Sequence, residues 1–149
     1  IVTCMDTRLI ELLPAALGIK NGDAKIIKNA GGVITHPFGS VVRSLLIAIY
    51  ELGVEEILVI GHTDCGVQHM DAENLLENMR KRGISNNAIE SLRYCGIDFD
   101  RWLEGFDDGC VSVAKSVELL KKHPLIPKDV RIYGFMMDSI SGKLSSVSE

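Results

Sequence analysis

The stretch Ile57-Leu58-Val59-Ile60, at the centre of Glu56–Gly61, decides the fold class. A short aliphatic run with no polar alternation is typical of a parallel strand that is covered on both faces. The segment before it favours a helix, because between Phe38 and Leu52 apolar residues recur at three- and four-residue intervals, at Val42, Leu45, Leu46 and Ile49. A helix that leads into a buried strand is one half of a βαβ unit, and we therefore expect a mostly parallel sheet.

Strand and helix signals alternate along the rest of the chain. Further strands are expected at Ile1–Cys4, Ala24–Lys28, Asp129–Phe135 and Leu144–Val147, and further helices at Leu9–Leu17, Asp71–Arg82, Phe99–Phe106 and Cys110–Lys122. The mixed stretch Ile84–Gly96 is expected to be loop with a helical turn. With right-handed crossovers, this alternation predicts an α/β fold. Its mostly parallel sheet has the strand order 2-1-3-4 with a short fifth strand, and helices flank it.

Composition narrows the class of protein. A length of 149 residues without an internal repeat or linker predicts a single domain, 1–149. Because Ile1 already lies in a strand-like run, we expect that the domain has an N-terminal segment that this sequence lacks. The formal net charge of −4 and the lack of a membrane-length apolar run make nucleic acid and membrane unexpected partners. Four cysteines without a secretory leader predict reduced thiols and a cytoplasmic location.

Metal-ligating residues follow two of the predicted strands. Cys4 ends the first strand, and His62 and Cys65 come directly after the strand Glu56–Gly61. Two thiolates and an imidazole suit Zn²⁺, although a His-x-x-Cys pair alone is a weak signal. Cys4 strengthens the signal for a metal site, because it ends a neighbouring predicted strand. Ligands bind at the carboxyl ends of parallel strands where the strand order reverses. Three ligands leave the fourth position to water or to Asp6, as in catalytic zinc sites.

Asp6 and Arg8 are candidate partners of that metal site. In an extended segment, alternate side chains point the same way, so Cys4, Asp6 and Arg8 would share one side of the chain. The alternative is an ordinary solvated ion pair. Asp6 has two possible partners, Arg8 and the open metal position, and nothing in the sequence fixes which of the two it takes.

Three motifs in order and spacing give the sequence a specific resemblance. The motifs that carry the resemblance are Cys4-Met5-Asp6-Thr7-Arg8, Asn29-Ala30-Gly31-Gly32 and Gly61-His62-Thr63-Asp64-Cys65-Gly66. With them the sequence resembles a β-class carbonic anhydrase, and it is most similar to the short, compact branch of that family. The resemblance continues through Arg43-Ser44-Leu45, Trp102-Leu103, His123-Pro124-Leu125-Ile126-Pro127 and Gly142-Lys143-Leu144. It therefore covers nearly the whole chain, but not Ser85–Asp98 with Cys95, nor Cys110, and we expect both of these thiols to be buried or neutral.

The resemblance implies an activity and a role for each matching residue. The activity is the reversible hydration of carbon dioxide to bicarbonate and a proton. Cys4, His62 and Cys65 would hold one zinc ion per protomer, and Asp6 and Arg8 would form the catalytic pair. The substrate pocket would be lined by Asn29, Ala30, Gly31, Gly32, Gly66 and Val67. The resemblance also implies a homodimer or a higher even oligomer.

Two alternatives to this function stay open at the level of sequence. The same site could hydrolyse carbonyl sulfide or carbon disulfide. The chain could instead be a non-catalytic zinc or thiol sensor, with Cys95 and Cys110 as redox partners. Asp6 and Arg8 argue against a sensor, since a structural metal site has no use for them.

Overall fold

The computed structural model describes residues 1–147, which form two compact units. The first comprises Ile1–Gly66 and the chain from Asp108 onward, and the second comprises Val67–Asp107. None of the described helices is long and apolar enough to cross a membrane. The expectation of a single domain over 1–149 stays a prediction.

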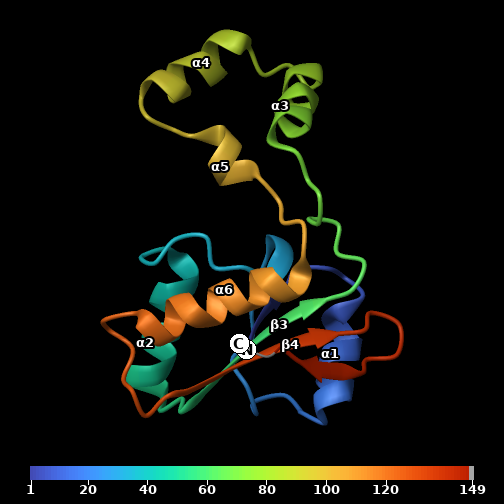
Figure 1. The fold of residues 1–149 in the computed structure, drawn as a ribbon, viewed down its shortest axis with the longest axis vertical. Coiled ribbons are helices and arrows are strands. Elements are labelled where there is room, and N and C mark those ends of the chain that lie inside the picture. Colours follow the sequence, from blue (N-terminus) through green and yellow to red (C-terminus); the bar gives the residue numbers. More distant parts are fainter. Residues whose placement is uncertain (148–149) are drawn as a thin grey trace. The chain divides into compact units, whose positions relative to one another are not determined.

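The first unit is built on a five-stranded sheet in its described part (Figure 1). Its strands are β1 (Val2–Cys4), β2 (Ile27–Asn29), β3 (Glu56–His62), β4 (Arg131–Met137) and β5 (Leu144–Ser146). The order is β2-β1-β3-β4-β5, in which β5 is antiparallel to β4 and the other neighbours are parallel. The predicted α/β class and strand order, with a short fifth strand, are confirmed.

Helices cover both faces of this sheet. α2 (Ser40–Leu52) and α6 (Gly109–Lys122) share one face, because their apolar side chains form one buried cluster with those of β1, β3 and β4. α1 (Leu9–Leu17) connects β1 to β2, which lies on one side of β1 in the sheet. The later parallel connections, from β2 to β3 and from β3 to β4, run across the sheet in the opposite direction. A right-handed connection then places α1 on the other face. The strand order reverses between β1 and β3, so a ligand site is expected where these two strands end.

The second unit consists of three helices around a small core. These are α3 (Ala72–Lys81), α4 (Asn86–Tyr94) and α5 (Phe99–Leu103), and the core side chains are Leu76, Ile89 and Phe99. The prediction of loop with one helical turn for Ile84–Gly96 is wrong, because α4 fills most of it. Ser85 caps this helix by accepting a hydrogen bond from the Ala88 amide. Ile89 is the one buried residue of α4, so this nine-residue helix buries no continuous apolar stripe that would mark it in the sequence.

Candidate metal centre

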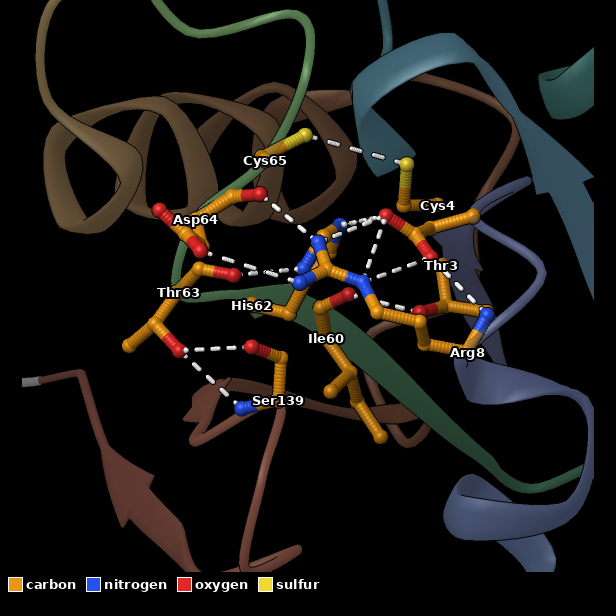
Figure 2. Close-up of polar contacts among 10 residues, drawn as sticks. Thr3, Cys4, Arg8, Ile60, His62, Thr63, Asp64, Cys65 and Ser139 are labelled. Atoms are coloured by element: carbon orange, nitrogen blue, oxygen red, sulfur yellow. Dashed lines mark hydrogen bonds and ion pairs between the residues drawn. The ribbon is translucent and has the colours of Figure 1, made fainter.

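Three metal-ligating side chains meet where β1 and β3 end (Figure 2). Cys4 is the last residue of β1 and His62 the last of β3, and Cys65 lies in the loop that follows. All three are buried, and their ligand atoms lie within 4.8 Å of one another. The two sulfur atoms are 3.8 Å apart. The structure therefore brings together the three residues that the sequence predicts as ligands.

The hydrogen bonds of His62 leave one ring nitrogen ready for a metal. Nδ1 lies 2.8 Å from the Thr63 carbonyl oxygen, so it carries the proton and donates it. Nε2 then carries a lone pair, is buried, and has no hydrogen-bond partner. A buried polar atom without a partner costs about 1–3 kcal/mol, and a metal ion would satisfy it. Two thiols and this imidazole suit a zinc-like ion.

Hydroxyl groups hold the ligand-bearing segments in place. Thr3, next to Cys4, donates from Oγ1 to the Ile60 carbonyl at 2.9 Å, which ties β1 to β3. Thr63, next to His62, accepts at Oγ1 from the Ser139 amide at 3.0 Å, which ties the loop to the end of β4. Sequence reasoning missed Thr3, Thr63 and Ser139. Only the strand register, which places Thr3 beside Ile60, could have indicated the first of them.

Asp6 and Arg8 form a tight ion pair beside the three candidate ligands. Arg8 Nη2 donates to Asp6 Oδ2 at 2.8 Å and Nε donates to Oδ1 at 3.1 Å. These hydrogen bonds, with one from the Arg8 amide, lower the pKa of Asp6 to about 2. Asp6 is therefore a carboxylate at neutral pH and can only accept hydrogen bonds. Its Oδ2 lies 4.0 Å from His62 Nε2, so it pairs with Arg8 and still borders the metal position.

The predicted pocket residues fall into different environments. Gly31 and Gly32 are buried, and Ala30 is exposed. Asn29 donates from Nδ2 to the Val33 carbonyl at 2.7 Å, whereas its buried Oδ1 has no partner. Gly66 faces open space, and Val67 begins the second unit. The part that these six residues play in a substrate pocket stays a prediction.

Gly32 fixes how closely the chain approaches Cys4, one of the three candidate metal ligands. Its φ is +65°, and a Cβ added to it would lie 2.8 Å from the Cys4 amide nitrogen and 2.9 Å from the Thr3 carbonyl carbon. Real Cβ atoms do not approach backbone so closely, so any larger residue would displace β1. Glycine is required here for two reasons, the left-handed backbone and the contact with the strand that carries Cys4.

We expect Gly32→Ala to destabilise the protein and to weaken zinc binding. Gly18→Ala is a matched control, because Gly18 also has a φ of +65° but nothing lies within 4 Å of an added Cβ. The free energy of unfolding of the control should fall by about 1–2 kcal/mol, from backbone strain alone. For Gly32→Ala it should fall by roughly 3–5 kcal/mol, since β1 must also shift. Urea unfolding of the metal-free proteins and zinc content measure both effects. Equal losses in the two variants would contradict the close-approach argument.

Cys95 and Cys110 lie away from these ligands in the chain, and both are exposed. Cys95 follows the last residue of α4, and Cys110 lies in the first turn of α6. Of the two expected states, buried or neutral, the buried one is wrong for both thiols, because the end of α4 and the first turn of α6 turn these positions outward. Their exposure makes them useful as control positions for metal binding.

Comparison with known proteins identifies the family. Residues 1–144 match the carbonic anhydrase family. YtiB of Bacillus subtilis, a carbonic anhydrase by name, is 49% identical over 147 residues, which cover 99% of this chain and 79% of YtiB. The crystal structure of β-carbonic anhydrase isoform I from Trichomonas vaginalis superposes with a TM-score of 0.90 at 39% identity, covering 98% of this chain and 79% of that one. This chain belongs to the β-carbonic anhydrase family.

The family resemblance that the three sequence motifs predicted is confirmed. Because the family consists of carbonic anhydrases, this β-carbonic anhydrase is an enzyme. A second activity occurs among its relatives. The carbon disulfide hydrolase of Saccharolobus solfataricus is 36% identical over 156 residues, which cover 97% of this chain and 74% of that protein. The family therefore fixes the fold and the enzyme class, and the relatives include more than one substrate.

Proposed function

We propose that this β-carbonic anhydrase catalyses the reversible hydration of carbon dioxide to bicarbonate and a proton, with one zinc ion per protomer held by Cys4, His62 and Cys65. The observation that carries this proposal is the cluster of three buried ligand atoms within 4.8 Å, one of which is the partnerless Nε2 of His62. The adjacent ion pair of Asp6 and Arg8 supports a catalytic site over a structural one, because a purely structural site needs no such pair.

Each charged residue has a distinct task in this reaction. A zinc ion held by Cys4, His62 and Cys65 would supply a water molecule of lowered pKa, about 7 instead of 15.7, as the nucleophile at neutral pH. Asp6, held as a carboxylate by Arg8, accepts a hydrogen bond from the attacking oxygen and orients its lone pair toward carbon dioxide. Arg8 holds Asp6 in place, and its permanent positive charge favours the bicarbonate anion as it forms.

Stopped-flow hydration with a pH indicator tests the proposal directly. The zinc-loaded protein should acidify a carbon dioxide solution far faster than buffer alone, and chelation of the zinc should abolish the acceleration. Zinc added back after chelation should restore it, which separates loss of metal from loss of folding. A zinc-loaded, folded protein with the rate of buffer alone would overturn the proposal.

Hydrolysis of carbon disulfide or carbonyl sulfide is the second candidate function. The 36% identity to a carbon disulfide hydrolase favours it, and the same three ligands and the Asp6–Arg8 pair would serve it. Release of sulfide from carbon disulfide by the zinc-loaded protein measures this activity. Sulfide release with a higher kcat/KM than carbon dioxide hydration would reverse the order of the two candidates. A sensor without turnover is the least supported alternative, given the family.

We also propose that the protein is a homodimer or a higher even oligomer in the cytoplasm, where reducing conditions keep the Cys4 and Cys65 thiols available as ligands. Large apolar side chains on and beside α2 are exposed in the single chain, namely Phe38, Ile47, Tyr50 and Leu52. Such a group of exposed apolar residues is typical of an interface. Sedimentation at micromolar concentration should show a dimer or larger, and a folded, active monomer would contradict this expectation.

A further inference from the structure

Asp64 lies between two metal ligands in an unusual backbone conformation. Its φ is +58°, and His69 is the other non-glycine residue with positive φ among those that the structure describes. A side chain with a Cβ clashes with its own carbonyl in this left-handed region, and only Gly, Asn and Asp adopt it readily. Residue 64 is therefore restricted by its backbone as well as by its position between His62 and Cys65.

The left-handed turn directs the Asp64 carbonyl oxygen at Arg8 (Figure 2). Arg8 Nη2 donates to this oxygen at 2.7 Å and also donates to Asp6 Oδ2 at 2.8 Å. One guanidinium nitrogen thus links the Asp6 carboxylate to the loop that joins His62 to Cys65. The Asp64 carboxylate is a weaker partner, since it is 88% exposed and its Oδ2 is 3.8 Å from Arg8 Nη1.

We propose that Asp64 is a positioning residue, whose left-handed backbone holds Arg8, and through Arg8 holds Asp6, in register with His62 and Cys65. The catalytic effect of this role rests on the proposed hydration reaction. Arg8 is 43% exposed, so without the carbonyl its guanidinium is free to turn into water. Asp6 would then lose the partner that holds it at the edge of the metal position. The backbone oxygen acts in this role, and the Asp64 carboxylate is dispensable.

Three substitutions at position 64 separate the backbone from the carboxylate. Asp64→Asn and Asp64→Gly remove the charge but keep a residue that tolerates positive φ, whereas Asp64→Ala removes both the charge and that tolerance. We expect kcat/KM for hydration to fall about tenfold in Asp64→Ala. This factor corresponds to the free-energy cost of keeping a residue with a Cβ in the left-handed conformation. Asn and Gly should recover most of this loss, and zinc content should stay the same in all three.

A readout without metal distinguishes this role from the proposed function. In the zinc-free parent protein, the Arg8 guanidinium should give restricted ¹⁵N–¹H NMR signals, because it is bound at both sides. These signals should persist in the Asn and Gly variants and broaden or move to free-arginine positions in the Ala variant. If the parent protein does not hydrate carbon dioxide, the proposed function fails while this NMR comparison still decides the positioning role.

A double variant measures whether Asp64 acts through Arg8. Lysine cannot donate to Asp6 and Asp64 in the same geometry, so Arg8→Lys already breaks the link. Adding Asp64→Ala to Arg8→Lys should therefore cost little further activity, whereas independent effects would multiply. Parent-like rates and Arg8 signals in Asp64→Ala would overturn the proposal, and so would equal losses in the Ala, Asn and Gly variants, which would assign the role to the carboxylate.

Discussion

Replacing Asp6 by asparagine should lower kcat/KM for carbon dioxide hydration by about two to three orders of magnitude, the range seen when one preorganised polar group is removed from a catalytic site. An amide keeps the shape of the side chain but presents an NH₂ donor where the reaction needs an acceptor. It also lacks the charge that pairs with Arg8 through hydrogen bonds of 2.8 and 3.1 Å. Zinc should stay bound, because Asp6 is paired with Arg8 and is not needed as a ligand.

Stopped-flow kinetics and zinc analysis on the same preparation test this result. Asp107→Asn is a matched control, because the Asp107 side chain is 99% exposed and lies in the second unit. The control should keep the parent rate. Unchanged turnover in Asp6→Asn would remove Asp6 from the mechanism, and loss of zinc in that variant would show instead that Asp6 contributes to metal binding.

The strand order could be predicted because two independent signals agree. The run Ile57–Ile60 marks a strand covered on both faces, and the alternation with helices then leaves few topologies. α4 was missed for the opposite reason, since it has a single buried residue, Ile89, and its start depends on one serine cap. Helices of this kind are stabilised by contacts that no local pattern contains. Arg93 on α4, for example, lies 3.7 Å from Glu73 and 3.9 Å from Asp100.

At the site, the sequence predicts residue types better than it predicts geometry. Cys4, His62 and Cys65 could be named because sulfur and imidazole ligands at the ends of neighbouring strands are few in this chain. The tautomer of His62 depends on a contact with the Thr63 carbonyl, and the restraint on Arg8 depends on the Asp64 carbonyl. Backbone oxygens carry no sequence signal, so their part in the site becomes visible only once the loop is folded.

Replacing Cys65 by serine should abolish stoichiometric zinc binding. A serine hydroxyl does not ionise near neutral pH and is a poor ligand for a metal that prefers thiolate and imidazole. The remaining pair, Cys4 and His62, would hold the ion weakly. The parent protein should bind about one zinc per protomer and gain thermal stability when zinc is added, because a ligand that binds only the folded state stabilises it. Both effects should be absent in Cys65→Ser.

Two further cysteines make this experiment specific. Cys95→Ser and Cys110→Ser remove exposed thiols outside the cluster of ligand atoms, and each should keep full zinc occupancy and the zinc-dependent rise in Tm. Elemental analysis of all three variants, purified side by side, then separates loss of a ligand from loss of any thiol. Full occupancy in Cys65→Ser, or iron as the metal in parent protein purified from unsupplemented cells, would contradict the assignment. Loss of zinc from Cys65→Ser alone would leave His62 Nε2 again as a buried atom without a partner, so this variant should also be less stable than the zinc-loaded parent.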